Sequence, residues 1–161
     1  MAVKLPVAGN RLCVFCGRVP LKKNREHVLP YWLLEMTGNP SRVVRLGIDF
    51  EKQKEIRFSW SSLVMPSCES CNSSYSQLEG EAKGIVEALV RRDSVAAGRY
   101  ITLLDWLDKV RVGLWLAYHV LQKNPTGISP SFHINQRVGA KDRFVAVYPI
   151  ESNNRGLNAW G

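Results

Sequence analysis

The sequence predicts an α+β fold built around a structural zinc site with four cysteine ligands. Three observations carry this prediction. Four cysteines fall into two Cys-x2-Cys pairs, short alternating segments typical of strands lie between the pairs, and two long segments with helical spacing follow. After the second long segment, two short runs predict a small β-hairpin. With 161 residues, the chain has the length of one domain, or of one domain with an extension.

The cysteines predict one shared metal site. They are Cys13, Cys16, Cys68 and Cys71, with none left over. The first ten residues lack the apolar run of an export signal, so we expect a cytoplasmic chain in which disulfides are disfavoured. Four thiolates are the number that a tetrahedral structural zinc requires, and Gly17 after the first pair suits the tight turn of a zinc knuckle. Two separate redox pairs, or unligated cysteines, are the alternatives.

The segments before the second cysteine pair are short. Leu29 precedes Pro30 and is therefore disfavoured in a helix, which ends one extended segment there. The other expected elements are strands at Leu12–Phe15 and Arg18–Val19, one helical turn at Tyr31–Met36, and a hairpin of Val43–Asp49 and Glu55–Trp60.

The segments after the second pair are longer. The spacing of apolar residues predicts helices from about Asn72 to Arg92 and from Leu103 to Lys123. Trp115 and His119 on the second helix are more typical of core packing than of a base-stacking platform or a ligand. The expected hairpin is Phe132–Arg137 with Phe144–Tyr148. We therefore divide the chain into a zinc-bound domain at 1–95 and an extension at 96–161. The abrupt end at Gly161 is typical of a fragment, so the extension is a candidate piece of a longer chain.

The charge of the chain favours a polyanionic partner. Its 22 Lys and Arg against 14 Asp and Glu give a net charge of +8, and residues 1–57 alone hold eleven basic and five acidic residues, a net of +6. No apolar stretch is long enough to cross a membrane, so the expected polyanionic partner is a nucleic acid, either DNA or RNA. An ordinary solvated surface would show the same charges. The expected phosphate contacts are Lys22, Lys23, Arg25, Arg42, Arg45, Lys52, Lys54 and Arg57.

Four further residues carry the chemistry of phosphodiester hydrolysis. Glu26 and His27 lie just before Pro30, and Asn72 and Glu79 are two helical turns apart, so a zinc that joins these segments would let them converge. Oxygen ligands suit Mg²⁺ or Mn²⁺, and imidazole accepts a proton near neutral pH. The structural alternatives are a zinc-shell role for His27, a surface ion pair of Glu26 with Arg25 or Lys23, and a helix N-cap for Asn72.

The order of these motifs resembles an HNH endonuclease of the zinc-knuckle type. The resemblance rests on Cys13-Val-Phe-Cys16-Gly17, Arg25-Glu26-His27-Val28-Leu29-Pro30-Tyr31-Trp32-Leu33, Cys68-Glu-Ser-Cys71-Asn72 and Leu78-Glu79, and covers about residues 11–90. It implies a ββα-metal core, with His27 as general base and with Glu26 and Asn72 on a catalytic divalent ion. It implies for Glu79 a ligand or supporting role, with an ion pair to Lys83 as the alternative.

One departure from the family pattern concerns the middle Asn, which is absent from residues 59–66. Ser61 or Ser62 is a candidate substitute. The expected function is a metal-dependent endonuclease acting on DNA, in phage defence or restriction, as a homodimer or with a partner protein. The alternatives are a non-catalytic zinc-dependent nucleic-acid-binding module and an assembly role for the apolar Leu103–Lys123 helix.

Overall fold

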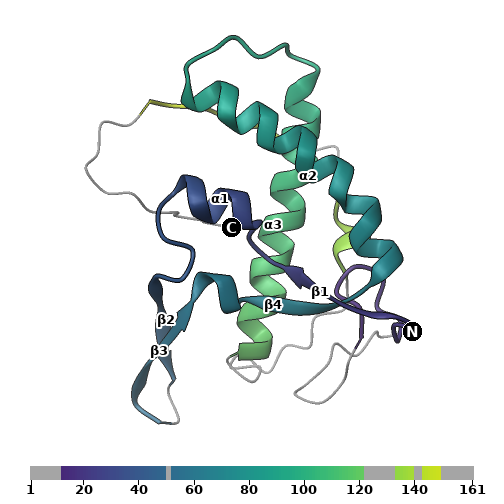
Figure 1. Cartoon of the computed structure of the whole chain (residues 1–161), viewed down its shortest axis with the longest axis vertical. Helices are drawn as coiled ribbons and strands as arrows, with labels where there is room; N and C mark the ends of the chain where they lie inside the picture. Colours follow the sequence, from purple (N-terminus) through teal and green to yellow (C-terminus); the bar gives the residue numbers. More distant parts are fainter. Residues whose placement is uncertain (1–11, 50–51, 122–132, 140–142, 150–161) are drawn as a thin grey trace.

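Two antiparallel strand pairs and three α-helices make up the regular structure in residues 12–49, 52–121, 133–139 and 143–149, the part of the chain that the computed structural model describes (Figure 1). The elements are β1 (Lys23–His27), α1 (Tyr31–Met36), β2 (Val43–Asp49), β3 (Lys54–Ser59), β4 (Val64–Cys68), α2 (Glu69–Val90) and α3 (Arg99–Leu121), with short 3₁₀ turns η1 (Trp60–Ser62) and η2 (Ile134–Gln136).

Strand β1 pairs with β4, and helix α2 begins directly where β4 ends. The register places Glu26 opposite Met65 and His27 opposite Val64. Consecutive side chains of a strand point to opposite faces. Glu26 and Met65 are accordingly buried, while His27 is exposed. The strand pair thus carries a carboxylate on its inner face and an imidazole on its outer face.

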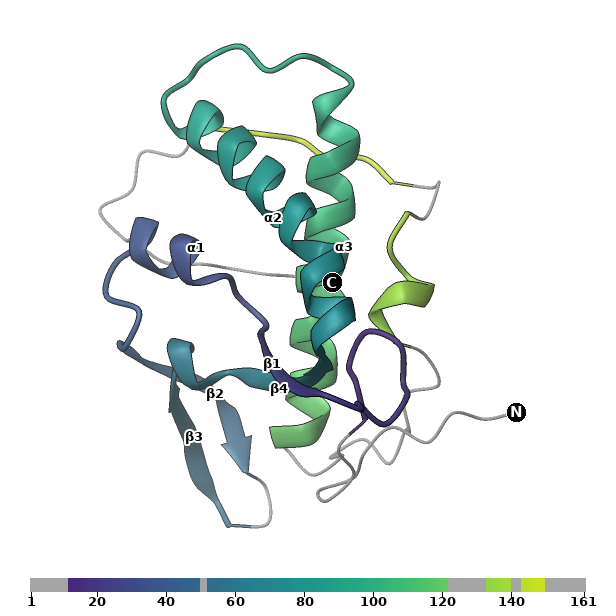
Figure 2. The ribbon, with the colours of Figure 1, turned by 45° about the vertical axis from the view of Figure 1, so that its right-hand side comes forward.

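Helix α3 runs through the middle of the molecule, and α2 crosses it (Figures 1 and 2). Two apolar clusters pack against α3. One consists of Cys13, Val14, Phe15, Val28, Leu63, Met65, Val112, Leu116, Ala117 and Ile134, and the other of Leu29, Leu33, Leu34, Ala82, Ile85, Leu103, Trp106 and Val110. Each cluster joins residues from before and after residue 95, so α3 shares its core with the first cysteine pair, β4, α1 and α2.

The β2–β3 hairpin projects from one end of the molecule (Figure 2). Its side chains bury little, because Val43 and Ile48 remain 67% and 50% exposed. A positive φ of 50° at Gln53 marks the turn between the strands. The hairpin therefore contributes surface to the molecule more than it contributes core.

Several elements lie where the sequence predicts them. The helical turn Tyr31–Met36 and the hairpin are confirmed, and the extended segment before Pro30 contains β1. Helix α2 begins at Glu69, three residues before the expected start, because Cys68 is its N-cap. Asn72 therefore lies inside the first turns, and the interpretation of Asn72 as the N-cap is wrong. Helix α3 begins at Arg99, four residues earlier than expected.

The strands predicted beside the first cysteine pair are wrong. Residues 14–16 form a turn, closed by a hydrogen bond of 2.8 Å from the N–H of Gly17 to the carbonyl of Cys13. Val14 donates instead to the carbonyl of Pro66 in β4, at 2.8 Å. The knuckle is thus held by its turn and by β4 rather than by a ladder of its own.

The prediction of a C-terminal β-hairpin is also wrong within the described residues. Ile134–Gln136 is a 3₁₀ turn, and residues 143–149 have no regular structure. The N–H groups of Ile134 and Asn135 donate to the carbonyls of Val14 and Phe15, at 3.1 Å each. Residues 133–139 therefore dock on the zinc knuckle. Phe132, at which the first expected strand begins, lies outside the described residues.

Candidate functional site

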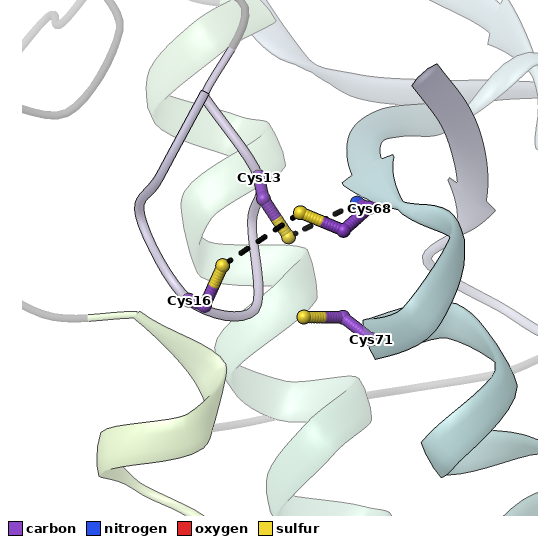
Figure 3. A group of neighbouring side chains, drawn as sticks. All are labelled: Cys13, Cys16, Cys68 and Cys71. Atoms are coloured by element: carbon purple, nitrogen blue, oxygen red, sulfur yellow. Dashed lines mark hydrogen bonds between the residues drawn. The ribbon is translucent and has the colours of Figure 1, made fainter. Parts of the chain in front are cut away.

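Four cysteine sulfurs form a compact cluster where the knuckle, β4 and α2 meet (Figure 3). All four Sγ atoms lie within 4.8 Å of one another, and those of Cys16 and Cys68 are 3.8 Å apart. A tetrahedron with Zn–S bonds of about 2.3 Å has sulfurs about 3.8 Å apart. That separation is also far too long for a disulfide, and all four cysteines are free. The cluster therefore fits a structural metal such as zinc.

The backbone around the cluster is arranged for this role. Gly17 has a φ of +70°, which favours glycine, and a Cβ there would come within 2.0 Å of His133 Nε2. The N–H of Cys68 donates to Cys13 Sγ at 3.2 Å. Burial lowers the pKa of His133, so a neutral imidazole packs on the knuckle.

The pKa values of the thiols are consistent with a cluster that binds a cation. Burial and the neighbouring sulfurs raise the pKa of Cys68 to about 11 and that of Cys71 to about 12. For Cys16, burial also acts to raise the pKa, but hydrogen bonds from Arg18 and other sulfurs outweigh it and bring the pKa to about 6. Four thiolates are thus not stable together without a positive charge between them, which a zinc ion would supply.

A second polar cluster lies under the strand pair. The ammonium of Lys109 on α3 makes ion pairs with Glu26 Oε1 on β1 and with Glu79 Oε1 on α2. Glu26 and Lys109 are 5% and 2% exposed. The Lys109 Nζ also lies 5.8 Å from the ring centroid of Phe15, a residue of the zinc knuckle. One lysine thereby links three elements and the knuckle.

These contacts correct two structural alternatives. The partner of Glu26 is buried Lys109, so a surface ion pair with Arg25 or Lys23 is wrong. The partner of Glu79 in the described residues is also Lys109, and Lys83 pairs with Glu87 at 3.8 Å. Burial raises the pKa of Glu26, Lys109 acts to lower it, and Glu79 raises it further.

The structure brings together two of the four residues expected at the catalytic site. Glu26 and Glu79 share one ammonium, whereas His27 is exposed on the opposite face of the strand pair. Asn72 is half-buried on α2, about 10 Å along the helix axis from Glu79 at 1.5 Å per residue. The roles of all four residues remain predictions.

A divalent ion does not fit between Glu26 and Glu79 as the side chains stand. The cation position is held by the Lys109 ammonium, and Mg²⁺ would need direct carboxylate contacts of about 2.0–2.1 Å. This arrangement gives no support to catalytic Mg²⁺ or Mn²⁺.

The basic residues expected to bind phosphate have different surroundings. Arg42 donates to the carbonyls of Leu34 and Asn39 and to the hydroxyl of Thr37, so it holds the end of α1. Arg45 and Arg57 both pair with Glu55, at 3.2 and 2.7 Å, on the exposed hairpin.

The remaining basic candidates lie elsewhere on the surface. Lys22 pairs with Glu69 at 3.1 Å. Arg25, Lys52 and Lys54 are exposed, and nothing is described for the side chain of Lys23. Arg25 and His27, two residues apart on β1, share its outer face.

The sequence pattern missed Lys109. A signal was present, because the helical neighbours of Lys109 at i−3 and i+3, Trp106 and Val112, are apolar, and a charge on that face is buried with them. Asp108 on the same helix is also buried, and it pairs with Arg143 at 2.9 Å, as Asp105 does at 2.7 Å. Arg143 therefore joins Asp105 and Asp108 in a partly buried ion-pair cluster.

Comparisons with known proteins found no match among family models, curated proteins or solved structures. Within the described residues, no helix combines the length and apolar character that crossing a membrane would need.

Proposed function

We propose that the chain is a zinc-stabilised, metal-dependent endonuclease of the HNH type that hydrolyses phosphodiester bonds in DNA. The observation that carries the proposal is the arrangement around the cysteine cluster. Strand β1 ends at His27 and its partner β4 ends at Cys68. Helix α2 starts at Glu69, between the cysteines of the second pair, and places Glu79 on the same ammonium as Glu26. This is the strand–strand–helix order that the HNH resemblance implies.

His27 is the general base in this proposal. Its imidazole is exposed, so water and a phosphodiester can both reach it, and Arg25 lies on the same face to contact a phosphate oxygen. Water attacks phosphorus and gives a proton to His27, the phosphorus–oxygen ester bond breaks, and the leaving oxygen takes up a proton from solvent water. Glu26 and Glu79 would hold a divalent ion once the Lys109 ammonium is displaced, and such an ion would supply positive charge to the phosphate oxygens.

The test is cleavage of supercoiled plasmid by zinc-loaded protein in Mg²⁺ or Mn²⁺, compared with His27→Ala. We expect the wild type to nick or cut and His27→Ala to lose at least about 100-fold in rate, in line with the usual contribution of a general base. His119→Ala is the matched control, because His119 is buried against Trp115. Its rate should stay near that of the wild type once its folded fraction is corrected for.

The outcomes separate the proposal from its rivals. Equal cleavage by wild type and His27→Ala would exclude His27 as the base, and cleavage that survives EDTA at unchanged zinc content would exclude the divalent ion. A wild type that binds plasmid but leaves it intact would overturn the nuclease.

A non-catalytic, zinc-dependent nucleic-acid-binding module is the second candidate. The observation that favours it is Lys109, because the ammonium already fills the cation position that an HNH site would give to a metal. Binding to plasmid that is lost on zinc removal, with no cleavage in Mg²⁺ or Mn²⁺, would establish this candidate.

A further inference from the structure

Lys109 lies between Glu26 and Glu79 and pairs with both carboxylates. Its ammonium is 2% exposed and pairs with one oxygen of each carboxylate. The stem of Lys109 comes from α3, whose neighbouring residues Trp106 and Val110 lie in the core. Core packing therefore fixes where the ammonium lies.

The ammonium and a divalent cation cannot both serve the same carboxylate oxygens. Each needs direct contact with those oxygens, and two cations that close together in a buried site repel strongly. With Lys109 charged, the cluster sums to −1, from two carboxylates and one ammonium. Without it the cluster would sum to −2, which a divalent ion neutralises in full.

We propose that Lys109 is an internal cation that competes with hard divalent ions for Glu26 and Glu79, and that removing its charge converts the pair into a Mg²⁺ or Mn²⁺ site. This goes beyond the proposed function, because it concerns metal binding with no nucleic acid present. It also assigns a role to α3, which delivers a positioning residue from outside the motif region. If the chain is a nuclease, metal binding at these carboxylates has to displace Lys109.

The experiment measures Mn²⁺ binding to zinc-loaded wild type, Lys109→Met and Lys109→Met/Glu79→Gln by electron paramagnetic resonance, with thermal melts in parallel. Methionine keeps an unbranched apolar stem and removes the charge. Mn²⁺ is a suitable probe, because soft thiolate ligands do not favour it over zinc. We expect Lys109→Met to bind Mn²⁺ at least about ten-fold more tightly than wild type and to melt at a higher temperature when Mn²⁺ is added.

The double variant is the matched control, since it lacks one of the two carboxylates. It should lose the gain in Mn²⁺ affinity. Equal Mn²⁺ affinities of wild type and Lys109→Met, or a gain that persists in the double variant, would overturn the proposal.

A second variant covers the case in which Lys109→Met does not fold. Lys109→Gln is neutral but still donates hydrogen bonds to a carboxylate, and it should show the same gain in Mn²⁺ affinity as the Met variant. Absence of the gain in folded Lys109→Gln also overturns the proposal. Plasmid cleavage does not enter these readouts, so failure of the nuclease proposal and failure of this one are distinguishable.

Discussion

A buried carboxylate is tolerated only when the surrounding residues balance or neutralise its charge. At Glu26 the balance is incomplete, because one ammonium serves two carboxylates. Burial is the largest influence on its pKa and raises it, and the nearby Glu79 adds to that effect. The protonated form of Glu26 is thus better suited to the folded state than to the unfolded chain, which makes Glu26 a source of pH dependence.

Replacing Glu26 by Gln should remove that pH dependence. The pKa of Glu26 in the folded state is raised above its ordinary value of 4.5. Between the unfolded-state pKa and the folded-state pKa, the folded chain therefore binds more protons than the unfolded chain, and the free energy of unfolding falls as pH rises. The measurement is urea unfolding of wild type and Glu26→Gln across this pH range. The free energy of unfolding of wild type minus that of Glu26→Gln should fall as pH rises and should level off above the folded-state pKa. A difference that rises with pH would contradict the raised pKa.

Gly17 should tolerate no side chain. An alanine there would adopt an unfavourable φ of +70° and place its Cβ within 2.0 Å of His133 Nε2. We expect Gly17→Ala to lower the free energy of unfolding by about 2–4 kcal/mol and to weaken zinc retention. Adding His133→Ala should recover part of this loss, since it relieves the contact but not the backbone strain. No recovery in that double variant would show that His133 does not set the cost.

At the scale of elements, local patterns account for α1 and the β2–β3 hairpin. Proline and glycine bracket α1, and alternation with a turn marks the hairpin, so the information is contained within each segment. The C-terminal segment differs because the partners of Ile134 and Asn135 are carbonyls of the knuckle, more than 100 residues earlier in the chain. The pairing of Lys109 with Glu26 and Glu79 depends in the same way on how three distant elements pack.

The hairpin should act as a contact surface for nucleic acid and add little to stability. Removing the charges of Arg45 and Arg57, which share Glu55 on its exposed face, should leave the free energy of unfolding within about 0.5 kcal/mol. If both contact phosphates, the slope of log affinity against log salt should fall by roughly two. The control is Arg42→Ala, which should destabilise the end of α1 instead. An unchanged slope in the hairpin variant would exclude this surface.

At the scale of the whole molecule, the cysteine cluster and α3 hold the same residues from two sides. The knuckle is tied to β4 and α2 through the four sulfurs, and its apolar residues Val14 and Phe15 pack in the cluster that contains Leu116 and Ala117 of α3. Phe15 also lies near the Lys109 ammonium. The zinc knuckle and the buried ionic cluster are therefore parts of one packed unit, although the sequence motifs end near residue 90.

A chain cut after residue 95 should consequently fail to fold cooperatively, even with zinc bound. The cut removes Leu103, Trp106, Val110 and Leu116, each at most 7% exposed, and burial of such side chains is worth about 1.5–3 kcal/mol apiece. The cut also removes Lys109, which leaves two carboxylates without a counter-ion. Since small domains are stable by only about 5–15 kcal/mol, the summed loss is as large as the whole stability of such a domain. A sharp thermal transition and dispersed amide resonances from residues 1–95 would contradict this and would establish them as an independent domain.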